Sequence, residues 1–293
     1  MEGSSLFNKI WVIESLPEGD LKTGTALVEG QLEEAKRAYP ELAVAFEQPK
    51  TKLELLDVLE KVRADTLLND NYPMIHFECH GCPDGLGTAT NEIITWDELR
   101  KILIGINQAC RLNLVIVLAA CNGVHLIKTA TKMDRAPFWA IIGPEVEVTA
   151  GDIMISFREF YKTFFETMNG DKAIDALNKG VARPDRTYHF LSAVGLFIKA
   201  YTKYYSKYCT GKRFRERAED LITEAMKNPD VRSRGVKWVR SQVKSALADK
   251  DVNFNKLKNR FFFIDCFPEN KERFPLSHSE MQKTYNHVLR LGR

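Results

Sequence analysis

Two residues with the chemistry of nucleophilic catalysis stand at equivalent places in the sequence. His80 follows the apolar run from Met74 to Phe77 and precedes Gly81, whereas Cys121 follows the apolar run from Leu112 to Ala120 and precedes Asn-Gly. A thiol is mostly protonated near pH 7, so a nucleophilic cysteine needs a neighbouring imidazole to take its proton. The pair therefore predicts acyl transfer, with Cys121 as nucleophile and His80 as general base and acid.

The same reaction requires donors for the negative oxygen of a tetrahedral intermediate. Backbone N–H groups of Gly81 and Cys121 are candidates for this oxyanion hole, because a glycine beside the histidine lets a substrate approach the main chain closely. This chemistry requires no metal and no cofactor.

The elements that must position these residues alternate between strand-like and helix-like patterns over the first two thirds of the chain. The segment from Leu112 to Ala120 is apolar, contains β-branched residues and has no proline, which is typical of a central strand buried on both faces. The alternation predicts an α/β fold, with a doubly wound, mainly parallel sheet flanked by helices. Because functional residues of such sheets lie beyond the carboxyl ends of the strands, His80 and Cys121 are expected to face one cleft.

These two motifs resemble those of the CHAT and caspase-like cysteine peptidases, a clan that includes separase, legumain and gingipains. The resemblance covers residues 8–185 and implies a caspase-like fold that cleaves a protein or peptide substrate through a dyad of His80 and Cys121. The spacing of 41 residues is shorter than the roughly 50 of caspases, and Ala-Cys-Asn-Gly departs from their Gln-Ala-Cys-Arg-Gly signature. This favours the CHAT branch and leaves a preference for aspartate unsupported.

Peptidases of the CHAT type are often switched effectors, in bacterial immune systems among other settings. The resemblance thus implies an activating protein or small-molecule signal and a role in antiviral defence. A binding or scaffold protein that keeps the fold without turnover is the alternative. Several acids are candidates for the specificity pocket, and no pattern in the sequence ranks them: Asp84, Asp97 and Asp152.

A zinc site is a rival interpretation of the same stretch, with Cys79, Cys82, Cys121 and His125 as ligands. Alternation along the strand argues against it, because Cys79 points away from the face of His80. His76 shares the face of His80 but lies deeper in the sheet, which predicts a packing role.

The charge of the chain is unevenly distributed. Residues 1–198 hold 20 Lys and Arg against 28 Asp and Glu, whereas residues 199–293 hold 22 against 11. The pattern becomes helical after about Tyr188, so we expect a peptidase domain over residues 1–188 and a basic, mainly helical extension over residues 189–293 that packs on it. The basic extension could contact the acidic domain, and binding of nucleic acid through it is a further alternative.

Six cysteines are spread over the chain without a secretory signal, which predicts reduced thiols and a cytoplasmic protein. No apolar run approaches the roughly 20 residues needed to cross a bilayer, so no membrane association is expected.

Overall fold

The computed structural model describes residues 6–121, 126–127, 133–144, 146–179, 187–209, 211–281 and 283. Two compact units are present. The first, the sheet unit, comprises Gly3–Ala130 and Ala136–Ala193, and the second, the helical unit, comprises Met1–Glu2, Thr131–Arg135 and Val194–Arg293.

The sheet unit is built on strands in the order β2-β1-β3-β6-β7-β8, in which neighbours up to β7 are parallel and β8 runs antiparallel to β7. Short strands β4 and β5 extend from the end of β3 as an antiparallel ribbon. The bounds are β1 Lys9–Ser15, β2 Ala43–Glu47, β3 Pro73–Gly81, β4 Gly85–Gly87, β5 Ile93–Thr95, β6 Val115–Ala119, β7 Ala140–Pro144 and β8 Tyr188–Ser192.

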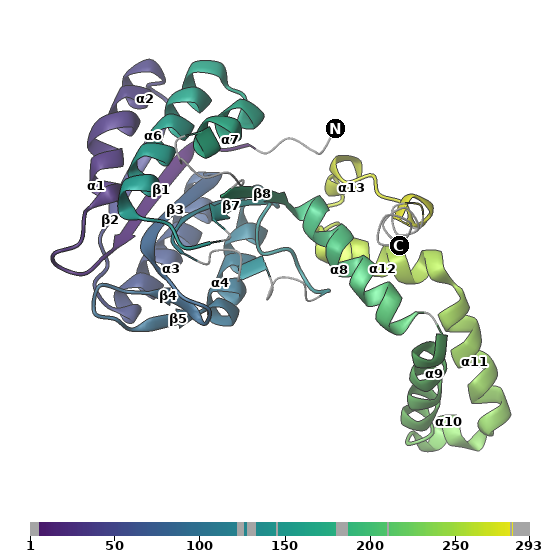
Figure 1. Cartoon of the computed structure of the whole chain (residues 1–293). Helices are drawn as coiled ribbons and strands as arrows, with labels where there is room; N and C mark the ends of the chain where they lie inside the picture. Colours follow the sequence, from purple (N-terminus) through teal and green to yellow (C-terminus); the bar gives the residue numbers. More distant parts are fainter. Residues whose placement is uncertain are drawn as a thin grey trace. The chain divides into compact units, whose positions relative to one another are not determined.

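Helices cover both faces of this sheet, so the predicted α/β class with a doubly wound, mainly parallel sheet is confirmed (Figure 1). A π-helical segment, η1, joins α1 to α2. On one face lie α1 Thr23–Leu27, η1 Val28–Leu32, α2 Glu33–Ala38, α6 Ala150–Thr167 and α7 Gly170–Lys179; on the other lie α3 Lys52–Asn69 and α4 Trp96–Ala109.

The starts of three helices follow directly from the sequence. Thr51, Thr95 and Thr149 each accept a hydrogen bond from the backbone of an acid three positions later, whose side chain returns to the backbone of the threonine. This capping box satisfies backbone N–H groups that a helix leaves unpaired at its start. The capping box therefore fixes the residue at which each of α3, α4 and α6 begins.

The hydrophobic core between the sheet and α6 is aromatic. Phe157, Phe160 and Tyr161 are buried on α6 and pack against alternate residues of β1, β3 and β6. Because side chains alternate across a strand, the face that carries Met74 also carries every second residue after it, up to His80.

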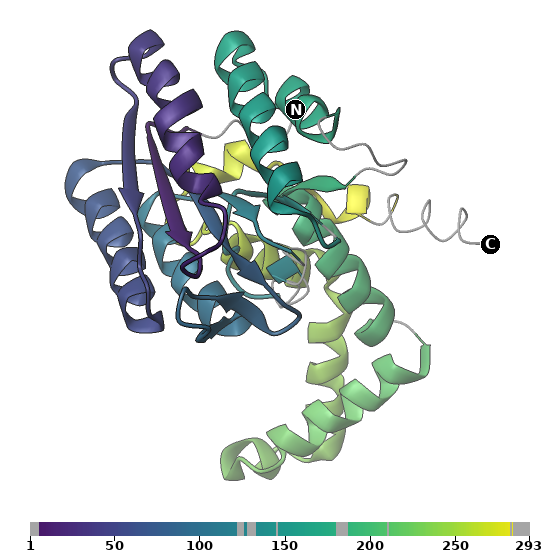
Figure 2. The same ribbon diagram turned by 60° about the vertical axis from the view of Figure 1, so that its left-hand side comes forward.

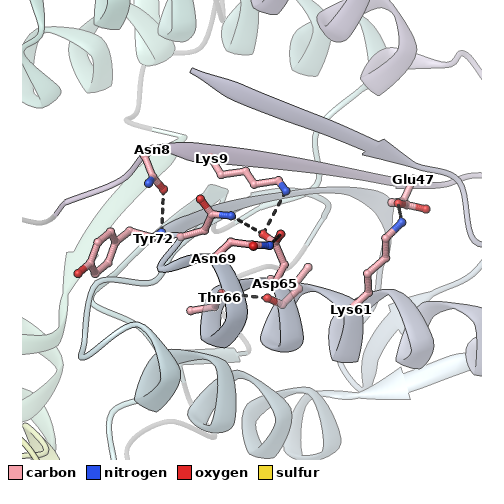
Figure 3. A network of polar contacts seen from close by, with 10 residues as sticks. Asn8, Lys9, Glu47, Lys61, Asp65, Thr66, Asn69 and Tyr72 are labelled. Carbon is pink, nitrogen blue, oxygen red and sulfur yellow. Dashed lines mark hydrogen bonds and ion pairs between the residues drawn. The ribbon is translucent and has the colours of Figure 1, made fainter. Parts of the chain in front are cut away.

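A polar network closes the opposite, amino-terminal edge of the sheet (Figure 3). Asp65 on α3 accepts hydrogen bonds from Lys9 at 3.1 Å, Asn69 at 2.9 Å and Asn71 at 2.8 Å. Burial alone would raise the pKa of Asp65, but these hydrogen bonds outweigh it and the pKa is lowered. The ionised carboxylate therefore fastens α3 to the start of β1.

The segment after Tyr188 differs from its predicted helical structure. Residues Tyr188–Ser192 form β8, and the helix begins only at Ala193. Tyr188 and Ser192 are buried while Phe190 is exposed, so the segment satisfies its backbone by pairing with β7 at the edge of the sheet. Sheet pairing overrode a helical spacing of apolar residues.

The helical unit consists of α8 Ala193–Tyr208, α9 Gly211–Ala225, α10 Pro229–Ser233, α11 Val236–Ala248, α12 Lys250–Phe261 and α13 Asn270–Arg273, apart from the first residue of α8, which lies in the sheet unit. The aromatic run from Phe261 to Ile264 is the buried end of α12 and the turn after it. Phe197 on α8 packs against Phe254, Phe261 and Phe262.

A short segment from the middle of the chain belongs to this helical unit. Arg135 makes two hydrogen bonds to the carboxylate of Asp265, at 2.8 and 2.7 Å, and Arg260 bonds Asp134 at 2.9 Å. These contacts hold Asp134 and Arg135 against α12 and the turn after it. Among the residues that the structure describes, no helix is both long and apolar enough to cross a bilayer.

Candidate active site

The pairing of two central strands brings the predicted catalytic residues to one edge of the sheet. Strand β3 pairs with β6 from Met74 and Val115 to Glu78 and Ala119, a constant offset of 41 positions. His80 is the second-last residue of β3, whereas β6 ends at Ala119 and Cys121 lies in the turn two residues after it, 41 positions from His80. Alternation along β3 places His80 on the α1 and α6 side of the sheet, at its carboxyl edge, and Cys121 packs against the core on that same side.

Gly81 brings the two strand ends together. A Cβ atom at this position would collide with the carbonyl group of Cys121 and would approach its backbone nitrogen to 3.1 Å. Only glycine allows the two main chains to lie this close. The two residues predicted to form an oxyanion hole are therefore adjacent.

The thiol of Cys121 is half-buried and lies against the start of α6. Its sulfur lies 3.5 Å from both the backbone nitrogen and the carbonyl oxygen of Val148, so it can accept a hydrogen bond from one and donate to the other. Val148 directly precedes Thr149, the N-cap of α6. The capping box of α6 thus positions the backbone that contacts the sulfur.

His80 contacts a residue that the sequence interpretation missed. Its Nε2 atom lies 2.6 Å from Oδ2 of Asp20, and the two side chains are 62% and 39% exposed. Asp20 ends the polar loop that follows β1, the strand beside β3. The sequence offered one signal for this contact: Asp20 is a carboxylate that follows a strand parallel to β3. Such strands end at the same edge of the sheet, so residues that follow them can meet there.

Buried carboxylates hold the loop that carries Asp20. Glu14 on β1 accepts hydrogen bonds from the backbone N–H and the hydroxyl of Thr25, at 3.0 and 2.9 Å. Glu78 on β3, opposite Glu14 in the register, accepts one from the hydroxyl of Thr23 at 2.7 Å. Both carboxylates therefore bind the first turn of α1, whose positive dipole end favours negative charge.

His76 completes this buried network, in the packing role predicted for it. It is fully buried, with Nε2 2.8 Å from Oε1 of Glu78 and Nδ1 3.0 Å from the hydroxyl of Tyr161. Burial and then the charge of Glu78 raise the pKa of Tyr161, so the phenol stays protonated and available as a donor. The network links the sheet to α6 below the candidate site.

No family model matches the chain, and no curated protein matches it. Among solved structures, it is similar to a secreted C11 cysteine protease from Bacteroides thetaiotaomicron, solved in complex with an irreversible peptide inhibitor. The sequence identity is 11% and the TM-score 0.44, over 69% of this chain and 72% of the other. A likeness this distant does not assign the chain to a family.

The remaining thiols near the site differ from Cys121 in their surroundings. Cys79 is buried on the opposite face of the sheet, and burial raises its pKa to about 12. Cys82 is half-buried just beyond β3. The rival zinc set therefore includes a thiol on the wrong face, and its fourth member, His125, lies outside the described residues.

The three candidate acids of the specificity pocket occupy different places. Asp152 belongs to the capping box of α6, next to the backbone that contacts Cys121. Asp97 lies in the first turn of α4 and pairs with Lys101 at 3.6 Å. Asp84 is exposed in the turn before β4. Asp152 and the backbone of Asp84 are each joined to the candidate site by a chain of contacts, the first through Val148 and the second through Trp96 and Cys82.

Proposed function

We propose that the chain is a cysteine endopeptidase in which Cys121 attacks the scissile carbonyl of a protein substrate. The observation that carries this proposal is the close approach of Gly81 to Cys121, at the carboxyl ends of the paired strands β3 and β6. A nucleophile, a base and two adjacent backbone groups then lie at one edge of the sheet, as acyl transfer requires.

The reaction follows from these groups. His80 takes the thiol proton as the sulfur of Cys121 bonds to the carbonyl carbon, and backbone N–H groups of Gly81 and Cys121 stabilise the negative oxygen. The C–N bond then breaks, and His80 returns the proton to the leaving amine. Water hydrolyses the thioester with His80 again as base, which regenerates the thiol. Asp20 orients the imidazole throughout.

The proposal includes activation by a partner protein or a small-molecule signal. Among the described residues, the imidazole of His80 bonds Asp20 and the sulfur of Cys121 bonds the backbone of Val148, and the two side chains make no hydrogen bond to each other. Catalytic hydrogen bonds often form only when substrate binds. A bound activator that moves the imidazole toward the sulfur would raise kcat with little effect on the fold.

The test compares wild type with Cys121→Ala, Cys121→Ser and His80→Ala against a library of internally quenched peptides, with mass spectrometry of the products. The same proteins are treated with peptidyl acyloxymethyl ketones, which alkylate activated cysteines of peptidases. We expect cleavage and alkylation by wild type, with a loss of at least about 1,000-fold in each variant, because members of a catalytic unit contribute together.

Cys82→Ala is the matched control, because it removes a thiol close to the site without removing the nucleophile. It should retain cleavage and alkylation. Cleavage that survives in Cys121→Ala would exclude this nucleophile. A wild-type protein that neither cleaves nor shows His80-dependent alkylation of Cys121 would instead indicate a binding or scaffold protein.

A further inference from the structure

Helices α9 and α11 lie side by side in the helical unit and are joined through the short helix α10 (Figure 2). Arg240 of α11 pairs with Glu219 of α9 at 3.0 Å, and Val239 and Ile222 are buried. The pair of helices thus has a defined packed side. Its other side is exposed to solvent.

The segment between Asp230 and Asp249, which includes α11, carries basic residues and no acidic ones. Between Asp230 and Asp249 the sequence has no Asp or Glu, and it has five Lys and Arg whose side chains are all exposed. Apart from Arg240, none of them contacts a carboxylate within the described part of the chain. We call these five residues the basic stripe: Arg232, Arg234, Lys237, Arg240 and Lys244.

The placement of the cations opposes helix stability. The first turn of α9 and the first turn of α11 contain no acid, while Lys212 and Arg213 begin α9 and Lys237 lies near the start of α11. A helix has a positive dipole end at its start, which favours acids there and disfavours cations. Arg232 lies in the last turn of α10, where the dipole favours a cation, but the cations at the starts of α9 and α11 gain nothing from the dipole, and attraction of an anionic partner would account for them.

Spacing along α11 suits a partner with regularly repeated charges. Lys237, Arg240 and Lys244 follow at intervals of three and four residues, so they lie on one face of the helix over a rise of about 10 Å. One strand of a nucleic acid presents a phosphate about every 3.4 Å along its axis. Several phosphates can therefore lie along this face.

Trp238 adds an aromatic ring beside Arg234, one residue of the stripe. Its side chain is 40% exposed, and the guanidinium of Arg234 lies 5.1 Å from the ring centroid. An exposed aromatic ring next to cations is the combination on which proteins stack the bases of a single strand. A membrane-binding helix would instead need a broad apolar face, and here only Trp238 and Val236 of α11 are large, apolar and exposed.

We propose that the basic stripe and Trp238 form a binding surface for nucleic acid, with the cations on the phosphates and the indole on a base of a single strand. This surface is independent of the proposed peptidase reaction. It gives the helical unit a ligand of its own.

The experiment measures fluorescence anisotropy of labelled 20-nucleotide single-stranded DNA, single-stranded RNA and duplex DNA with the full-length protein, between 50 and 200 mM salt. The test variant replaces Arg232, Arg234, Lys237 and Lys244 with Gln and keeps Arg240 so that the ion pair to α9 survives. The matched control makes the same change of net charge on the sheet unit: Lys101→Gln, Arg158→Gln, Lys162→Gln and Lys172→Gln.

Wild type and control should bind the oligonucleotides with an affinity that falls steeply with salt. The test variant should bind at least about 10-fold more weakly at 50 mM salt, and the slope of log affinity against log salt should fall by about 2 or more. Trp238→Leu should weaken single-strand binding more than duplex binding. Thermal unfolding of each variant verifies that the helices remain folded.

Three outcomes would overturn the proposal: wild type that does not bind at 50 mM salt, a test variant that binds as tightly as the control, or, in a parallel sedimentation assay with vesicles that carry anionic headgroups, binding to the vesicles by a protein that binds none of the oligonucleotides. The last result would identify a lipid surface as the partner. Because anisotropy needs no active Cys121, failure here leaves the peptidase proposal untouched, and the converse also holds.

Discussion

The backbone of Gly81 lies directly against the backbone of Cys121, although 40 residues separate them in the chain. The contact leaves no room for a side chain. It joins the end of β3 to the turn after β6, where the proposed nucleophile and its proposed base must meet. The first prediction tests this contact.

Gly81→Ala should lower both stability and activity. The added methyl group forces the two strand ends apart, at a cost of about 1–3 kcal/mol in the free energy of unfolding, and moves Cys121 away from His80. Urea unfolding and peptide cleavage measure the two effects. Gly30→Ala is the control, because nothing lies within 4 Å of a Cβ there, and its helical position predicts a slight gain in stability. Full activity of Gly81→Ala would show that the close approach is not required.

Asp20→Asn should reduce kcat while KM and the fold change little. Asp20 contacts the imidazole and not the thiol, so its loss leaves the base without its orienting partner. We expect a fall of about 10-fold, smaller than for a buried triad aspartate because both side chains are partly exposed. Glu18→Gln removes the same charge from the same loop and should retain wild-type kcat. Equal losses in the two variants would indicate a general charge effect, and Asp20→Glu tests whether a carboxylate restores the rate.

Alkylation by iodoacetamide should separate the cysteines by their surroundings. Burial raises the pKa of Cys79 to about 12, so this thiol should remain unlabelled in the native protein between pH 7 and 9 and react only after unfolding. Cys121 should react, and more slowly in His80→Ala. Peptide mass spectrometry identifies the modified sites, with the exposed Cys266 as the internal reference for unassisted reaction. Labelling of Cys79 in the native protein would contradict its burial in β3.

Asp65 should make stability depend on pH at the acid end of the range. The pKa of Asp65 in the folded protein is lowered below its unfolded value of about 3.9. Its contribution to the free energy of unfolding is therefore fully present above the unfolded pKa and is lost as the pH falls through the folded pKa. At neutral pH, Asp65→Asn should cost about 1–3 kcal/mol, because three hydrogen bonds to a charged acceptor are weakened.

The comparison that checks this is the free energy of unfolding of wild type and Asp65→Asn between pH 2.5 and 7. The gap between the two should close as the pH falls. Asp57→Asn, an exposed acid on the same helix, should show no such gap. A constant difference at every pH would assign the effect to packing and not to the charge of Asp65.

Several features of the fold follow from local patterns and were predicted. The continuous apolar run before Cys121 is a buried central strand, because only a strand covered on both faces can bury so many consecutive apolar side chains. Alternation along β3 correctly separates Cys79 from His76, because successive side chains of any strand point to opposite faces.

Other features depend on partners that are distant in the sequence. Tyr188–Ser192 is a strand because an unpaired edge of β7 was available, and a local apolar period carries no information about that edge. Asp20 meets His80 because β1 and β3 are neighbours and end together, which only strand order reveals. Residue types and their spacing therefore determined the chemistry that the chain could perform. The tertiary structure decided which carboxylate and which backbone groups surround His80 and Cys121. The physical reason is that sheet pairing joins segments that local propensity treats independently.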